Sequence, residues 1–90
     1  MGMTALQVQI MPESLETSLE KLKGDVEEKI TSVGGKITEI KEEPIAFGLK
    51  ALIATIAWPE SLDTDLAENT IQGIEGVSST KIIDYRRAFG

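Results

Sequence analysis

Two strand-like segments near the middle of the chain are joined by the stretch Glu42-Glu43-Pro44-Ile45-Ala46-Phe47-Gly48-Leu49-Lys50-Ala51-Leu52. Proline fixes its own φ and biases the residue before it toward extended geometry, so we expect a strand to end at Glu43 and a loop to follow. Phe47 lies inside this loop, where a large aromatic is unusual because loops face water. Two interpretations stay open: Phe47 plugs one end of the core, or it is presented to a partner.

The segments on either side of this loop differ in polarity. Residues 36–43 form a short polar segment with Ile37 and Ile40, which is typical of an edge strand. Residues 49–58 are nearly all apolar and stop at Pro59, which indicates a central strand covered on at least one face. The sequence therefore predicts a polar edge strand followed by an apolar central one.

A longer helix is expected before this pair of strands, over residues 17–33. Its apolar positions recur at spacings of three and four: Leu19, Leu22, Val26, Ile30 and Val33. Thr17 with Glu20 has the spacing of a capping box. Gly34-Gly35 predicts the helix end, because glycine tolerates the left-handed conformation.

A second, shorter helix is expected over residues 64–74, after the apolar strand. Thr64 or Asp63 can cap it, and Gly73 and Gly76 loosen its end. Alternating apolar and polar residues predict a first strand over residues 4–11 and a last strand over residues 77–85. The chain then ends in a tail with two adjacent cations, Arg86 and Arg87.

The predicted order is β-α-β-β-α-β, in which each half is a strand, a threonine-capped helix and a second strand. This is the α+β pattern of a ferredoxin-like split βαβ sandwich, a four-stranded antiparallel sheet with two helices on one face. Right-handed crossovers place the first and third strands in the centre of the sheet.

Composition narrows the range of functions. The 90 residues suffice for one domain, and they include neither cysteine nor histidine. Thiolate metal sites and disulfides are therefore excluded, and the most common general base is missing, which argues against most hydrolase chemistry. The formal net charge of -6 opposes binding to nucleic-acid phosphates. No apolar run reaches the length of a membrane span or a signal core, so we expect a cytoplasmic protein.

Other ferredoxin-like functions fit the residues less well. An RNA-binding module needs aromatics on the central strands and basic residues around them. The first strand has no aromatic, the third ends in Trp58, and the chain is acidic. An RNA-binding or ribosome-associated module remains the alternative function, beside a small allosteric or self-associating domain that uses the polar second strand.

The central loop quoted above resembles the signature of the translation elongation factor 1-beta family, in its short archaeal form. Met11-Pro12-Glu13 and Ile74-Glu75-Gly76-Val77 are also similar to that family. The resemblance spans the chain and implies a single exchange domain over residues 1–90. It implies a guanine-nucleotide exchange factor for elongation factor 1-alpha, the GTPase that delivers aminoacyl-tRNA. Such a factor works by protein–protein binding, as a monomer when free, with no cofactor, metal, membrane or direct nucleic-acid contact of its own.

The resemblance also implies which residues meet the GTPase. Phe47 and Gly48 match the family's Phe-Gly loop, and Lys50 at its end could pair with a carboxylate of the partner. A basic residue near the C-terminus displaces Mg²⁺ in the family, and the matching position is Arg87, with Arg86 beside it. The eukaryotic relatives carry lysine there.

Overall fold

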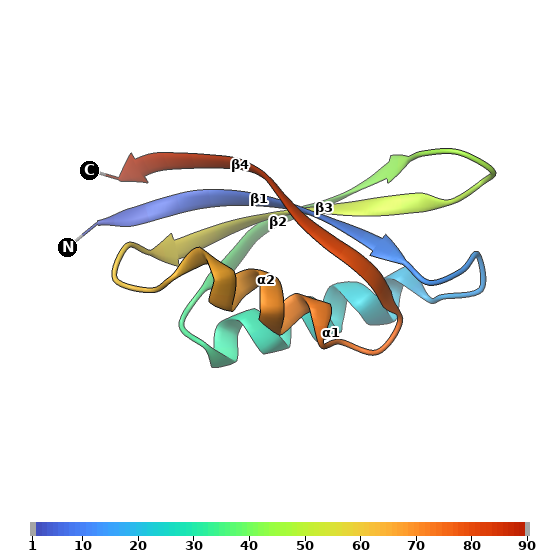
Figure 1. Ribbon diagram of the computed structural model, residues 1–90, viewed down its shortest axis with the longest axis horizontal. Coiled ribbons are helices and arrows are strands. Elements are labelled where there is room, and N and C mark those ends of the chain that lie inside the picture. The colour runs from blue at the N-terminus through green and yellow to red at the C-terminus, as the bar shows by residue number, and fades with distance from the viewer. Residues whose placement is uncertain (1, 90) are drawn as a thin grey trace.

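The computed structural model describes residues 2–89, with the side chains of residues 87–89 left undescribed. The elements are β1 (Met3–Pro12), α1 (Leu19–Ser32), β2 (Lys36–Pro44), β3 (Lys50–Pro59), α2 (Thr64–Gln72) and β4 (Val77–Phe89). The strands form one antiparallel sheet in the order β2-β3-β1-β4, and both helices lie on one face of it (Figure 1). The predicted ferredoxin-like fold is confirmed, with β1 and β3 in the centre.

The core lies between the sheet and the two helices. Every second residue of β1 is buried, and β3 pairs with β1 from Met3 opposite Pro59 to Ile10 opposite Leu52. The core side chains from these central strands are Leu6, Val8, Ile10, Leu52, Ala54, Ile56 and Trp58. The helices cover them with Leu22, Val26, Ile30, Ala67 and Ile71. The apolar run of the third strand is thus explained by its central place in the sheet.

Helix α1 begins one residue after the predicted cap. Ser18, not Thr17, caps α1, and its side chain accepts a hydrogen bond from the Lys21 amide at 3.2 Å. Thr17 instead closes the turn before the helix, where its hydroxyl accepts from the Ser14 amide at 3.3 Å. The capping box of Thr17 with Glu20 is therefore wrong, because that hydroxyl is already engaged.

Helix α2 is capped by Asp63, whose carboxylate accepts from the Asp65 amide at 3.0 Å, so Thr64 is its first helical residue.

The end of α1 agrees with the prediction. Gly34 has φ of 105°, its amide donates to Thr31 O at 3.2 Å, and the Gly35 amide donates to Ile30 O at 3.0 Å. These two bonds satisfy carbonyls that the helix would otherwise leave unpaired.

Strand β4 is longer than the sequence predicts, and its backbone includes Arg86 and Arg87 of the predicted tail. Its pairing with β1 continues past Tyr85 to Arg86 opposite Ala5 and Phe89 opposite Met3. The first residues of β1 offer backbone groups that would otherwise lie at an open edge, so the chain continues the ladder. Three register shifts accompany this pairing. Neither helix in residues 2–89 is long and apolar enough to cross a membrane.

Candidate functional site

Three loops meet at one end of the sheet, which we call the loop end: residues 13–18 between β1 and α1, 45–49 between β2 and β3, and 73–76 between α2 and β4 (Figure 1). The Glu13 amide donates to Gly76 O at 2.9 Å, which ties the first loop to the third. A Cβ atom on Gly48 would lie 3.5 Å from Leu15 Cδ2, so the first loop also touches the second. The three segments that carry the family resemblance therefore lie together.

The loop between β2 and β3 is closed by its own backbone. The Ile45 amide donates to Leu49 O at 2.9 Å, and the Leu49 amide donates to Ala46 O at 3.1 Å. Phe47 occupies the turn with φ of 59°, the single positive φ of a non-glycine residue within residues 2–89. Such a backbone conformation costs about 1–3 kcal/mol and is concentrated at functional sites.

The side chain of Phe47 is 93% exposed. The interpretation in which Phe47 plugs the core is therefore wrong. The large aromatic that fills that role is Trp58 at the other end of β3, which is fully buried and donates its indole N–H to Leu62 O at 3.2 Å. The loop thus holds an aromatic ring in water on a strained backbone.

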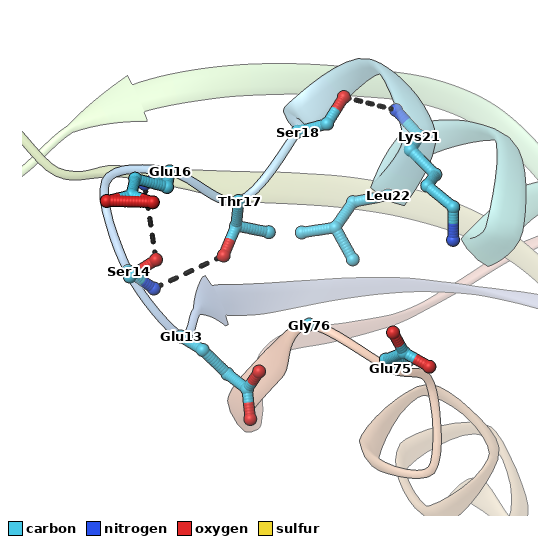
Figure 2. A pocket seen from close by; sticks show the side chains of 9 residues that line it. All are labelled: Glu13, Ser14, Glu16, Thr17, Ser18, Lys21, Leu22, Glu75 and Gly76. Atoms are coloured by element: carbon cyan, nitrogen blue, oxygen red, sulfur yellow. Dashed lines mark hydrogen bonds between the residues drawn. The ribbon is translucent and has the colours of Figure 1, made fainter.

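Next to this loop lies a hollow of about 290 Å³ between the first and third loops (Figure 2). Three exposed carboxylates border it, those of Glu13, Glu16 and Glu75. None of the three forms an ion pair with another described residue. Lys21, the lysine that also lines this hollow, pairs with Asp25 at 3.3 Å instead. The loop end therefore combines an exposed ring with an acidic border.

Lys50, the predicted partner-binding lysine, has a partner inside the chain. Glu42 lies between two lysines, with its carboxylate oxygens 2.9 Å from Lys23 Nζ and 3.7 Å from Lys50 Nζ. The hydrogen bond from Lys23 holds the pKa of Glu42 below its usual value, and the same bond raises the pKa of Lys23. Lys23 still balances the negative charge of Glu42 when Lys50 moves away. Lys50 can therefore leave this exposed ion pair at little cost in free energy.

The two C-terminal arginines lie far from this loop, at the opposite end of the sheet, which we call the terminal end. Arg86 pairs with Ala5, and Ala5 pairs with Ala57. Ala57 lies seven residues along β3 from Lys50, which at about 3.3 Å per residue is about 23 Å. The structure therefore brings Phe47, Gly48 and Lys50 together and separates Arg86 and the backbone of Arg87 from them.

Arg86 is fixed over the uncovered face of the sheet. Its Nε lies 3.0 Å from Asp84 Oδ2, while Asp84 Oδ1 accepts from the Tyr85 amide at 2.9 Å. A hollow of about 270 Å³ beside it is lined by Ala5, Gln7, Thr55, Asp84 and Arg86. The Arg86 side chain remains 78% exposed beside this ion pair. The side chain of Arg87 lies outside the described part of the structure.

The uncovered sheet face has little in common with an RNA-binding surface. Its central residues are small, amide or aliphatic: Ala5, Gln7, Gln9, Ile53, Thr55 and Ala57. Trp58, the aromatic at the end of the third strand, points into the core instead. Base stacking on the central strands therefore has no support in this sheet.

Sequence reasoning missed three side chains at these two ends. Leu15 is exposed in the first loop and touches the Phe47 loop, Glu42 holds Lys50, and Asp84 holds Arg86. Leu15 carried a usable signal, since it is an isolated leucine among Ser and Glu in a turn. Glu42 carried none, because its two lysines come from α1 and β3. Asp84 carried one, because residues two apart in a strand lie on the same face and Arg86 is two residues on. Within residues 2–89 no group of three or more acidic side chains is placed to hold a metal ion.

Comparison with known proteins agrees with this geometry. Residues 5–87 match the model of the EF-1 guanine nucleotide exchange domain. The chain is 41% identical over 88 residues to Elongation factor 1-beta of Methanothermobacter thermautotrophicus, with 97% of this chain and 98% of the relative covered. It is 38% identical over 82 residues to Elongation factor 1-beta of Sulfolobus acidocaldarius, with 89% and 90% covered.

A solved structure supports the fold alone. The C-terminal domain of the MgtC protein from Mycobacterium tuberculosis, a solution structure, superposes with a TM-score of 0.71 at 13% sequence identity, covering 99% of this chain and 94% of that one. At that identity the likeness carries no functional statement.

The match over residues 5–87 thus places this ferredoxin-like domain among the guanine-nucleotide exchange domains. The chain belongs to the EF-1 guanine nucleotide exchange domain family. Its function is guanine-nucleotide exchange in translation elongation.

Proposed function

We propose that this protein accelerates the replacement of GDP by GTP on elongation factor 1-alpha, by binding that GTPase and making or breaking no covalent bond. The family match over residues 5–87 supports this partner. The observation that carries the proposal is Phe47, held in water on a strained turn within the sequence that resembles the family signature. The whole chain acts as one exchange domain, and since translation elongation is cytoplasmic, so is the activity.

The mechanism is a difference in affinity between two states of the GTPase. An exchange factor must bind the GTPase with a disturbed nucleotide site more tightly than the GTPase with intact Mg²⁺·GDP. A factor with equal affinity for both would shift nothing, however tightly it bound. The disturbed state releases GDP, and GTP then enters and displaces the factor.

The two ends of the sheet are proposed to divide this work. Phe47 and Gly48 supply an apolar contact at the loop end, and Lys50 exchanges Glu42 for a carboxylate of the GTPase. Arg86 or Arg87 reaches the Mg²⁺ site at the terminal end, where a fixed cation repels the metal and occupies its carboxylate ligands. The two contacts on the GTPase then lie about 23 Å apart, the separation of the two ends along β3.

The direct test follows fluorescent GDP as it leaves elongation factor 1-alpha, with and without this protein. We expect release to accelerate in proportion to protein concentration at micromolar levels and to saturate. Equal release rates with and without protein would contradict the proposal.

Phe47→Ala tests the loop end. Removing the exposed ring should raise the concentration needed for half-maximal exchange by about tenfold or more, because a central aromatic carries a large share of contact energy. The urea midpoint should stay unchanged, since the ring contributes nothing to the core. Leu66→Ala on α2 is the matched control, because Leu66 is also exposed but lies away from the loop end. Equal effects of the two variants would count against the loop.

Arg86→Ala and Arg87→Ala, made separately, test the terminal end. We expect one of them to lower the maximal exchange rate by about tenfold or more with a small change in half-maximal concentration, because a charge-assisted contact is worth roughly 1.5–3 kcal/mol. Lys81→Ala removes one positive charge from the middle of the same strand and is the control. Unchanged maximal rates in both arginine variants would move metal displacement away from the terminal end.

A further inference from the structure

Three large apolar side chains stand exposed at the loop end, and two of them belong to the Phe47 loop. Phe47 is 93% exposed, Leu15 66% and Ile45 37%. Leu15 comes from a different loop, between β1 and α1, and the family resemblance gives it no role. An exposed group of apolar side chains bordered by polar residues is the usual mark of a protein-binding surface.

Leu15 and the Phe47 loop form one continuous surface. A Cβ atom on Gly48 would meet Leu15 Cδ2 at 3.5 Å, which is ordinary van der Waals contact. A groove of about 220 Å³ runs between the two loops and is lined from both, with Pro12 and Leu19 on one side and Leu49 and Lys50 on the other. A partner that covers Phe47 therefore also reaches Leu15.

The turn that carries Leu15 is held in place before any partner binds. The Thr17 amide donates to Ser14 O at 3.2 Å, the Glu16 amide donates to Ser14 Oγ at 3.2 Å, and Thr17 Oγ1 accepts from the Ser14 amide at 3.3 Å. The neighbouring Glu13 amide is bonded to the third loop. Because the backbone is already ordered, contact with Leu15 costs little conformational entropy.

The charge around this surface selects its occupant. Glu13, Glu16 and Glu75 line the neighbouring hollow, which shares Ser14 and Thr17 with the groove beside Leu15 (Figure 2). These three carboxylates form no ion pair with another described residue. A second copy of this chain docked through the same surface would bring two such acidic borders together, which is unfavourable. The complementary partner carries an apolar face bordered by lysine or arginine.

We propose that Leu15 is a second apolar anchor for the GTPase, binding beside Phe47 on the same apolar, basic-bordered face. This inference rests on the proposed function and adds to it a contact residue from a separate loop. Two neighbouring anchors inside a polar border reproduce the usual anatomy of an interface, in which a few central side chains carry most of the affinity.

The test measures binding of elongation factor 1-alpha directly, by titrating it against labelled wild-type protein, Leu15→Ala, Leu15→Asp and Leu66→Ala. Leu15→Ala should weaken binding by about tenfold and Leu15→Asp by more, since it also places a charge on the apolar face. Leu66→Ala, the exposed leucine away from the loop end, should bind within about twofold of wild type. All variants should keep the wild-type urea midpoint, which separates lost contact from lost fold.

A double variant shows whether the two anchors act together. Leu15→Ala with Phe47→Ala should weaken binding by less than the product of the two single effects, because neighbouring contacts are coupled. Wild-type affinity in Leu15→Ala would overturn the inference, and so would self-association of the wild type that Leu15→Asp abolishes. Binding without accelerated GDP release would contradict the proposed function alone. The inference about Leu15 would stand, because the comparison of Leu15→Ala with Leu66→Ala measures affinity and not exchange. Absence of binding would overturn both.

Discussion

Strand β3 has an aromatic residue near each end, and the two are placed in opposite ways. Trp58 at the terminal end is fully buried, donates its indole N–H to Leu62 O and accepts a hydrogen bond from the Thr4 hydroxyl at its carbonyl. Phe47, just before the strand at the loop end, is almost entirely in water on a strained turn. One aromatic stabilises the fold and the other is kept at a cost to it. The presence of an aromatic residue near the end of a strand therefore does not show whether it packs in the core or faces water.

The largest effect is expected from Trp58→Ala. Deleting a fully buried indole should lower the free energy of unfolding by about 3–5 kcal/mol, a large part of what a domain of this size possesses. Urea denaturation followed by far-UV circular dichroism measures it, with Phe47→Ala beside it as the matched aromatic. We expect Phe47→Ala to stay within about 0.5 kcal/mol of wild type. Similar losses in both variants would remove the contrast between the two ends.

Two glycines, Gly35 beside Trp58 and Gly48 at the loop end, compare how tightly the two ends of the sheet are packed. A Cβ on Gly35 would lie 2.8 Å from Trp58 Cε3 and 2.7 Å from Ile30 Cγ2, so Gly35→Ala should cost about 1–3 kcal/mol through overpacking. Gly48, at the loop end, has φ of 79°, and a Cβ there would meet Leu15 Cδ2 at the ordinary contact distance of 3.5 Å. Gly48→Ala should therefore cost only its backbone strain, about 1 kcal/mol. Urea midpoints of the two variants measure the difference, and equal costs would mean that the loop end is packed as tightly as the core.

Phe47→Gly should change stability and function in opposite directions. The left-handed backbone costs a non-glycine residue about 1–2 kcal/mol, and glycine loses about 0.5–1 kcal/mol more through the unfolded chain. The variant should therefore gain about 0.5 kcal/mol in urea denaturation while its exchange activity falls as in Phe47→Ala. A loss of stability above 1 kcal/mol would show that the ring supports the fold after all.

The smallest effect is expected from Glu42, where pH is the variable. Its pKa is lowered in the fold, chiefly by the hydrogen bond from Lys23, so its contribution to stability is present above the ordinary carboxyl value of 4.5. That contribution is lost as pH falls through the lowered pKa. Urea midpoints of wild type and Glu42→Gln should thus differ slightly near neutral pH and converge in acid. Glu43→Gln, which removes the same charge one residue away, is the matched control for the loss of a carboxylate.

Periodicity and proline placement were enough to predict the fold. The spacing of Leu22, Val26 and Ile30 marks α1, and the change from a polar segment to the apolar run ending at Trp58 identifies edge and centre strands. Caps were harder, because Thr17 and Ser18 are equally good cap residues in a sequence, and only the Ser14 turn decides between them. The length of β4 depends on partners offered by β1, which its own residues do not encode.

The candidate site was predicted in part. Pro44 before a Phe-Gly pair marks a loop, and the exposure of Phe47 decides between its two interpretations. The sequence did not show that Lys50 and Arg86 lie at opposite ends of the sheet, since that separation follows from antiparallel register. Glu42 was missed because its lysines come from two other elements. Asp84 was missed although Arg86, two residues along the same strand, lies on the same face.

The pairing of β1 with β4 has a mechanical consequence. Met3 lies opposite Phe89, so both ends of the described chain leave the sheet at the terminal end and point the same way (Figure 1). Their hydrogen bonds run perpendicular to the strands, so tension applied to the two ends loads these bonds one after another rather than all at once. Under force the molecule should unzip from the terminal end at low load. The three loops, farthest from the point of pulling, would keep their shape longest.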